Sequence, residues 1–418
     1  MRKAIIIGGG PSGLAAALRL QQTTDMSATV YELRHEPTTL GGAVGIMPNG
    51  LRLLARLGVL EHLLARGSSN PTLTVRSLRS GTLATQDMVQ GISELNGGYG
   101  YLRLKRTDLV GVLVKAVSEA GIPIHFNKSL VKIEEIKDTA VKVTFSDGST
   151  DTADVLLGCD GIHSAVRRLY VDPALVPVYT GFSGLGAIID CPKDLPAREV
   201  QGINATLTTE GVLGVMSCSA TEDQVFWGVS KQVPLPTSGD TRDGWEVKRE
   251  EEVADFKENL LELLAGARGQ WGTIIRTLVG ETQAVKFYPV FKLPFGGSWY
   301  KGRCLLLGDA AHAMPPHAGQ GTSQAIEDVF LIARLLADPS RPLHDAFAKY
   351  EQIRRPRVVE ITNQATRNAG IRKKTSPWGL WVKELAIWAY FSVAALLNIQ
   401  VGRGMRKQVL YNIEDAEI

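Results

Sequence analysis

The sequence of 418 residues predicts an α/β fold: a Rossmann-like nucleotide-binding domain, a mainly β domain inserted into it, and a helical C-terminal segment. Three observations predict this fold. A short apolar run at 4–7 leads into a glycine-rich turn and a helical stretch, which is typical of a nucleotide-binding βα unit. Residues 176–292 read mostly as strands and contain no second turn of this kind. Residues 371–418 read as helices.

The glycine-rich turn carries a specific pattern. Residues 8–13, Gly-Gly-Gly-Pro-Ser-Gly, fit G-x-G-x-x-G. Gly8 permits the tight turn, Gly10 lets a pyrophosphate approach the backbone, and Gly13 allows close packing of the helix on the strand. A second strand ends at Glu32, whose carboxylate can bind the ribose hydroxyls of an adenosine. Strand, turn, helix, strand and acid in register predict a dinucleotide site, without choosing between NAD and FAD.

The rest of the chain divides into further helices and strands. Between the turn and residue 160 we expect a helix at 51–60, a strand at 73–78 and a helix at 106–121 with Thr107 as its N-cap. Strands follow at 122–126, 130–136 and 140–157, with a hairpin turn at 146–149. One charged helix, near 249–266, interrupts the later strands. The predicted nucleotide-binding domain comprises 1–72, 101–175 and 293–370, the substrate domain 73–100 and 176–292, and the C-terminal helical segment 371–418.

Composition narrows the class of protein. The chain is 44% hydrophobic and 21% charged, as in ordinary globular proteins. Its formal net charge of +3 is small and the basic residues are dispersed, which argues against a nucleic-acid partner. The scattered cysteines lack CxxC spacing, so we expect a reduced compartment and no metal site; they are Cys159, Cys191, Cys218 and Cys304. The first residues run straight into a strand, leaving no room for a signal peptide, and we expect a cytoplasmic protein.

Two later motifs each follow a buried apolar run. "CDGIHSAVR" (159–167) follows the apolar residues 155–157, and "GDAAHAMPPHAGQG" (308–321) follows 304–307. Together with the N-terminal turn, they strongly resemble the single-component FAD-dependent monooxygenases of the para-hydroxybenzoate hydroxylase and salicylate hydroxylase type. Motif order and spacing match over about residues 1–370. The resemblance implies that the nucleotide-binding domain is an FAD-binding domain and that NAD(P)H serves as a transient co-substrate.

The resemblance also implies roles for particular residues. Asp309 would bind the ribityl chain of FAD, and the motif that contains Asp160 is associated with the FAD pyrophosphate and with nicotinamide use. Arg106 matches an arginine that contacts FAD, and Gly45 lies in a loop beside the cofactor. The flavin end of the site would be formed by Pro316, which stiffens its loop, by Gly319 and Gly321, which let the ring approach the backbone, and by Thr322, where a helix opens.

The implied reaction is a flavin monooxygenation. Hydride transfer to FAD would be followed by reaction of the reduced flavin with O2 to a C4a-hydroperoxide. One oxygen atom would then enter an apolar, aromatic or polycyclic small molecule of the secondary-metabolite type, by hydroxylation or epoxidation. Three alternatives are open: Baeyer–Villiger oxygenation of a ketone, a flavin-dependent reductase or dehydrogenase of the same fold, and a non-catalytic flavoprotein or membrane-recruited binding module.

The substrate-binding residues are the least defined part of the sequence. Many relatives carry a Trp-Arg pair after a "YTG" segment, but Leu185 and Gly186 stand at those places here, so that arginine's role cannot be transferred. His317 is the polar residue expected nearest the flavin, as a catalytic candidate or as a loop histidine bonded to the backbone. Phe226 and Trp227 are candidates for the substrate pocket, but they fall on opposite faces of a strand, so one at most can line it.

The C-terminal segment raises a membrane question. Residues 385–402 carry no charge, and tryptophans occur at 378, 381 and 388. We favour a buried or dimer-face helix, with an interfacial helix and a true span as the alternatives. A peripheral membrane contact through 378–400, and a monomer or a homodimer, are therefore left open.

Overall fold

The computed structural model describes residues 2–37, 42–137, 139–234, 250–397 and 403–418. Its larger part is built on a six-stranded sheet in the order β17–β18–β11–β1–β2–β7. Neighbouring strands are parallel, except for β17 at the edge. The central apolar runs are fully buried, as expected for parallel strands covered on both faces. These strands are β1 (Arg2–Ile7), β2 (Met26–Tyr31), β7 (Ile124–His125), β11 (Val155–Gly158), β17 (Tyr300–Lys301) and β18 (Cys304–Leu306).

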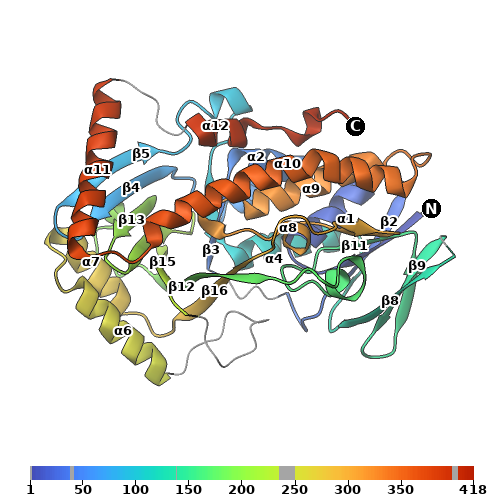
Figure 1. Cartoon of the computed structure of the whole chain (residues 1–418), viewed down its shortest axis with the longest axis horizontal. Helices are drawn as coiled ribbons and strands as arrows, with labels where there is room; N and C mark the ends of the chain where they lie inside the picture. The colour runs from blue at the N-terminus through green and yellow to red at the C-terminus, as the bar shows by residue number, and fades with distance from the viewer. Residues whose placement is uncertain (1, 38–41, 138, 235–249, 398–402) are drawn as a thin grey trace.

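Helices and two small sheets surround this sheet. Helix α1 packs against α4 and α9, and α9 packs in turn against α2 and the long helix α10 (Figure 1). The antiparallel sheet β10–β9–β8 packs against β1 and β11, and its β9–β10 hairpin turns at 146–149 as predicted. The bounds are α1 (Pro11–Thr23), α2 (Pro48–Arg56), α3 (Leu60–Leu64), α4 (Arg106–Glu119), α9 (Gly321–Leu336), α10 (Leu343–Ala369), β8 (Leu130–Ile136), β9 (Ala140–Phe145), β10 (Thr150–Ala153), and the paired β3 (Ala43–Ile46) and β6 (Leu102–Lys105).

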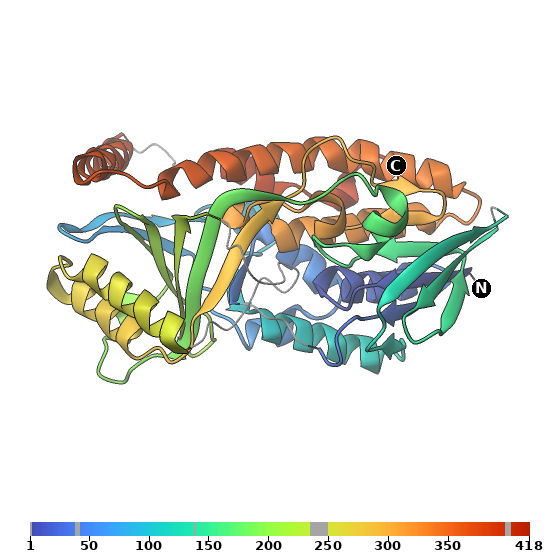
Figure 2. The ribbon, with the colours of Figure 1, turned by 60° about the horizontal axis from the view of Figure 1, so that its bottom comes forward.

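A seven-stranded, mostly antiparallel sheet forms the other end of the molecule. Its order is β16–β12–β15–β14–β13–β4–β5. Helices α6 (Glu250–Leu264) and α7 (Gly269–Gly280) lie on one of its faces, as Figure 2 shows. The strands are β4 (Thr72–Ser77), β5 (Gly81–Asp87), β12 (Val178–Asp190), β13 (Ile203–Leu207), β14 (Gly211–Ser217), β15 (Gln224–Gln232) and β16 (Lys286–Lys292). Strands from 72–87 and 178–292 share this one sheet. We therefore propose that the predicted substrate domain, 73–100 and 176–292, is built on it.

The sequence reading differs from this sheet in two places. It expected one helix between the later strands, whereas α7 follows α6 directly. Glycines and β-branched residues make 269–280 a poor intrinsic helix, but burial of Trp271, Ile275 and Leu278 against the sheet stabilises it. Residues 81–87, where no strand is predicted from the sequence, form β5, which pairs with β4.

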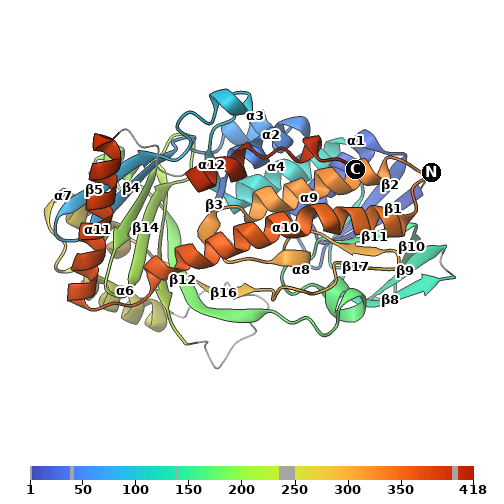
Figure 3. The ribbon, with the colours of Figure 1, turned by 45° about the horizontal axis from the view of Figure 1, so that its top comes forward.

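The C-terminal residues return along the molecule. Helix α11 (Pro377–Leu396) packs beside β5, at the end opposite both chain termini (Figures 1 and 3). Helix α12 (Arg403–Leu410) then packs on α2. The predicted helical segment 371–418 therefore contains two α-helices within its described residues. Among the described residues there is one helix, α11, whose length and apolar composition would allow it to cross a membrane.

Candidate active site

Four neighbouring strands of the six-stranded sheet end at the residues that the sequence singles out. Gly8 follows β1, Glu32 follows β2, Asp160 follows β11 and Asp309 follows β18. The strand order β18–β11–β1–β2 places these strands side by side. Because parallel strands end at the same edge of a sheet, segments from the two ends of the chain meet there, which is where α/β folds bind nucleotides.

A cleft of about 470 Å³ opens at this edge. Eight of the predicted cofactor residues line it: Gly8, Gly10, Glu32, Arg106, Asp160, Asp309, Gly321 and Thr322. The cleft is also lined by basic side chains that the sequence reading did not single out, namely Arg34, Lys128 and Arg168. Motif matching could not find them, because Arg34 and Lys128 sit in loops and Arg168 lies in the helical turn Arg167–Val171, just beyond the second motif.

The N-terminal turn has an open cradle for an anion. Gly8 has a φ of +110°, and a Cβ on it would lie 2.4 Å from the Cys159 carbonyl oxygen. A Cβ on Gly13 would lie 2.0 Å from the Gly8 carbonyl oxygen, so Gly13 is required for α1 to pack this closely. A Cβ on Gly10 would meet no atom within 4 Å. Gly10 is the N-cap of α1, where no side chain caps the helix, so its N–H groups and dipole face open space.

The acidic residues of the cleft differ in how they are bonded. Glu32 accepts hydrogen bonds from the backbone N–H groups of Gly9 (2.6 Å) and Arg34 (2.9 Å), which fix its carboxylate beside the turn. Asp160 accepts from the Ser164 hydroxyl (2.5 Å) and the Ala165 N–H (2.6 Å). Burial raises the pKa of Asp160, against the lowering effect of these bonds. Asp160 therefore braces its own turn.

Asp309, in the third motif (308–321), is connected to the second motif (159–167). Asp309 is exposed on the cleft wall as the first residue of α8 (Asp309–His312). Arg167, at the end of the second motif, is 2% exposed and donates to the Ala310 carbonyl oxygen at 2.7 Å. It also donates to the backbone carbonyl of Ile162. This arginine thus connects, by hydrogen bonds, the second and third motifs, which are far apart in the sequence. It holds the segment that carries Asp309 in place.

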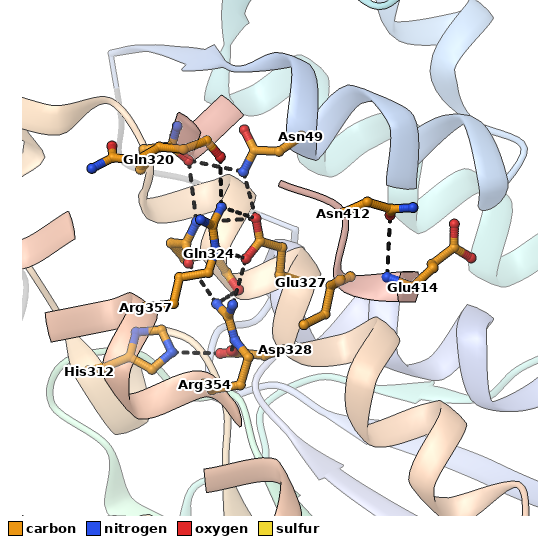
Figure 4. Close-up of polar contacts among 12 residues, drawn as sticks. Asn49, His312, Gln320, Gln324, Glu327, Asp328, Arg354, Arg357, Asn412 and Glu414 are labelled. Atoms are coloured by element: carbon orange, nitrogen blue, oxygen red, sulfur yellow. Dashed lines mark hydrogen bonds and ion pairs between the residues drawn. The ribbon is translucent and has the colours of Figure 1, made fainter. Parts of the chain in front are cut away.

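A buried ionic network supports the third motif from behind (Figure 4). Asp328 on α9 accepts from the Gly308 N–H at 2.8 Å and contacts His312 Nε2 at 2.6 Å. Arg354 on α10 donates to Asp328 (2.7 Å) and to the neighbouring Glu327 (2.5 Å). Burial alone would raise the pKa of Asp328, but His312 and Arg354 lower it to about 2. The network fixes the position of the strand-to-helix turn at Gly308.

The same network continues to the start of α9. Glu327 accepts from Asn49 on α2 at 2.7 Å and from Arg357 at 2.7 Å. Asn49 also donates to Gln320, the residue before α9 begins (3.1 Å; Figure 4). The N-terminus of α9 is therefore anchored where Gly321 and Thr322 line the cleft. The sequence signal for this network is the charged pair Glu327–Asp328, which directly precedes the apolar run 329–333 of the same helix.

The remaining predicted residues lie near the cleft without lining it. Gly45 is on β3, where a Cβ would lie 2.5 Å from the Tyr101 hydroxyl. Pro316 and Gly319, with a φ of +64°, shape the loop before α9. His317 lies in that loop: its backbone carbonyl accepts from Asn368 and its ring meets the Phe182 ring edge-on at 6.1 Å. Burial, together with nearby Arg372, lowers the pKa of His317 to about 3.

The two pocket candidates on β15 face opposite ways, as their alternation predicts. Trp227 is fully buried against α6 and α7, and its indole N–H donates to Thr282 at 2.8 Å. It lies on the helix-covered face and lines no part of the cleft. Phe226 faces the other way: a Cβ on Gly42 would lie 2.5 Å from its ring. The Gly42 carbonyl accepts from the N–H of Arg106, so the Phe226 ring lies near the cofactor-side loop.

Comparison with known proteins decides the family. The family model described as "FAD binding domain" matches residues 1–365. The chain belongs to this FAD-binding family. It is 31% identical over 363 residues to the 3-amino-4-hydroxybenzoate 2-monooxygenase PtmB3 of Streptomyces platensis, covering 85% of each chain. It is 28% identical over 374 residues to the 6-hydroxynicotinate 3-monooxygenase of Pseudomonas fluorescens, covering 89% of this chain and 92% of the relative.

A solved structure matches the whole fold of this FAD-binding family member. Klebsiella pneumoniae HpxO complexed with FAD and uric acid aligns over 99% of this chain and 97% of its own, with a TM-score of 0.80 and 20% identity. The predicted resemblance is thus confirmed, and so is the fold class. The chain is an enzyme, an FAD-dependent monooxygenase. The open cradle at Gly10 and the mixture of basic and acidic side chains along the cleft fit this cofactor.

Proposed function

We propose that this monooxygenase consumes NADH or NADPH and inserts one oxygen atom from O2 into a flat, mainly apolar aromatic or polycyclic molecule, by hydroxylation or epoxidation. The relatives named above act, by their names, on single substituted aromatic rings. FAD, when bound, supplies the two-electron chemistry and the activation of O2. The protein's part is to orient the substrate and to exclude water from the reacting atoms.

We propose that the two halves of FAD bind at opposite ends of the cleft. The turn containing Gly8 and Gly10, with Glu32 beside it, would hold the adenosine and pyrophosphate of FAD. Asp309 would accept hydrogen bonds from the ribityl hydroxyls, and the N-terminus of α9 at Gly321 would face the flavin. These residues remain our proposed FAD site, together with Gly13, Gly45, Arg106, Asp160, Pro316, Gly319 and Thr322.

His317 has the chemistry of a hydrogen-bond acceptor rather than of an acid. Since burial depresses its pKa to about 3, its imidazole is neutral at neutral pH. Its Nε2 atom is buried without a hydrogen-bond partner among the described residues. We therefore propose that the neutral His317 ring hydrogen-bonds a ligand group at the flavin end of the cleft.

A row of glycines is the observation that supports the substrate class. Gly186 on β12 pairs with Gly228 on β15, which pairs with Gly214 on β14. Side chains alternate along strands, so these glycines share the face of Phe226, opposite the one covered by α6 and α7. Their backbone forms a floor that carries no side chains of its own, and the Phe226 ring lies against it at Gly228, where a Cβ would be 3.0 Å from the ring. Lys286 stands at the edge of this row, opposite Gly186, so the charged end of a ligand would lie at the margin and its ring system over the floor.

The test is a turnover assay with matched ligands. The FAD-loaded enzyme would be supplied with NADH or NADPH, O2, and a panel of polycyclic phenols and indoles beside single-ring carboxylates. We expect coupled NAD(P)H and O2 consumption with a product heavier by one oxygen atom, and a preference for the polycyclic compounds. Turnover without O2 would identify a reductase. A cyclic ketone added to the panel would identify a Baeyer–Villiger enzyme if one oxygen atom entered beside its carbonyl to give a lactone.

A pair of variants locates the pocket. Phe226→Ala removes a ring from the proposed substrate face, so the KM for a polycyclic substrate should rise by about tenfold. Trp227→Phe changes the opposite, helix-covered face, so it should lower stability while leaving the KM within about twofold. Equal effects on the KM would contradict this placement of the substrate.

A further inference from the structure

Helix α11 has two apolar faces, and one of them is uncovered. Its inner face packs on the seven-stranded sheet: Leu380 is 7% exposed and, with Ile387, contacts Val75, Leu207 and Val212. Its outer face carries large apolar side chains that are 42–81% exposed. They include Trp378, Trp381, Leu385, Trp388, Val393 and Leu396, here called the outer face. Water is a poor environment for so much apolar surface, so the outer face is expected to have a partner.

Basic residues outnumber acidic ones around the outer face. Glu384, the acidic residue of α11, is 5% exposed and pairs with Arg79 at 3.3 Å. Lys383 is half-buried, with its ammonium against the Lys373 carbonyl. Residues 361–412 contain eight Lys and Arg but Glu384 alone as an acidic residue. Glu210, just before β14, pairs with Lys374 at 2.9 Å. The outer face is therefore uncharged, and its surroundings carry a net positive charge.

We propose that α11 docks the enzyme peripherally on an anionic lipid surface. The outer face would enter the boundary between headgroups and acyl chains, where tryptophan is favoured, and exposed basic residues such as Lys373 and Lys374 would meet lipid phosphates. This goes beyond the proposed oxygenation and does not depend on it. The placement of α11 at the end of the molecule leaves its outer face accessible to a flat surface (Figures 1 and 3).

Charge complementarity favours lipid over a second copy of the chain. A two-fold dimer through α11 would bring two sets of the same basic residues together, and Glu210, the acid beside them, already pairs with Lys374 of its own chain. An anionic bilayer supplies the missing negative charge.

The inner face argues against a membrane span. To cross a bilayer, α11 would have to leave the sheet, break the Arg79–Glu384 ion pair, and carry Glu384 and Lys383 into hydrocarbon. A helix lying in the interface keeps all of these contacts. The proposal is therefore an interfacial helix, held on the protein by one face and on lipid by the other.

The experiment is vesicle co-sedimentation with the full-length, FAD-loaded protein. Sucrose-loaded vesicles of phosphatidylcholine would be compared with vesicles containing about 30% phosphatidylserine, at about 0.1 and about 0.5 M NaCl. We expect the protein to sediment with the anionic vesicles at low salt and to be released at high salt. Replacing Trp381 and Trp388 by Gln should weaken binding by at least about tenfold. Lys373→Gln and Lys374→Gln should each weaken it by about fivefold.

Matched controls separate binding from folding. Leu95→Gln alters an apolar side chain that is 60% exposed elsewhere, and Lys193→Gln removes an exposed charge elsewhere; neither should change sedimentation. Flavin content should match the wild type in every variant. The proposal is overturned if anionic vesicles do not sediment the protein. It is equally overturned if light scattering detects a dimer that the tryptophan variants dissolve, or if alkaline carbonate fails to extract vesicle-bound protein, as for a span.

Discussion

Arg354 should contribute more to stability than any surface arginine of α10. Its side chain is completely buried, and it donates to the carboxylates of Asp328 and Glu327, which are at most 1% exposed, and to the amide oxygen of Gln324. Arg354→Met would remove the cation and leave buried negative charge that Arg357 alone cannot balance. Breaking one side of such a pair costs about 3–5 kcal/mol. The free energy of unfolding should fall by that amount.

The assay is urea unfolding of the FAD-loaded enzyme, followed by far-UV circular dichroism and by release of the flavin. The urea midpoint should fall by at least about 1 M, and flavin should be lost early because Asp328 holds the turn at Gly308. Arg367→Met is the control, since this exposed residue of the same helix should cost under about 1 kcal/mol. Adding Glu327→Gln to Arg354→Met should restore about 1–2 kcal/mol. If Arg354→Met costs no more than the control, the network does not stabilise the third motif.

Three further predictions concern the cofactor cleft. Gly10→Ala should weaken FAD binding by about tenfold or more without lowering apoprotein stability, whereas Gly13→Ala should lower stability, as paired FAD titrations and thermal melts would reveal. Asp309→Ala should reduce flavin content after gel filtration, and unchanged content would contradict its role. His317 has a depressed pKa, so the unfolded chain binds its proton more readily; stability should fall by about 2 kcal/mol between pH 7.5 and 5, and His317→Asn should remove that part of the pH dependence.

The sequence by itself determined the local chemistry of this protein. The turn at Gly8 to Gly13 depends on glycines at fixed spacing, and the three acidic residues predicted for the site, Glu32, Asp160 and Asp309, each follow a strand. Such signals are readable because strand, turn and cap preferences act over a few residues. The alternation of Phe226 and Trp227 was readable for the same reason, although not which of the two faces the cofactor side.

The tertiary structure decided the contacts between segments far apart in the sequence, which local sequence patterns do not specify. The order of strands β18, β11, β1 and β2 brings Asp309 beside Gly8, and no spacing rule states that order. Arg354 acquires its partners from a helix 26 residues away in the chain, and α7 is helical because the sheet buries it. Which face of α11 is exposed was decided by the packing of its other face on the seven-stranded sheet. Burial and long-range pairing are properties of the packed chain, so a sequence pattern predicts the groups that take part but not the contacts they make.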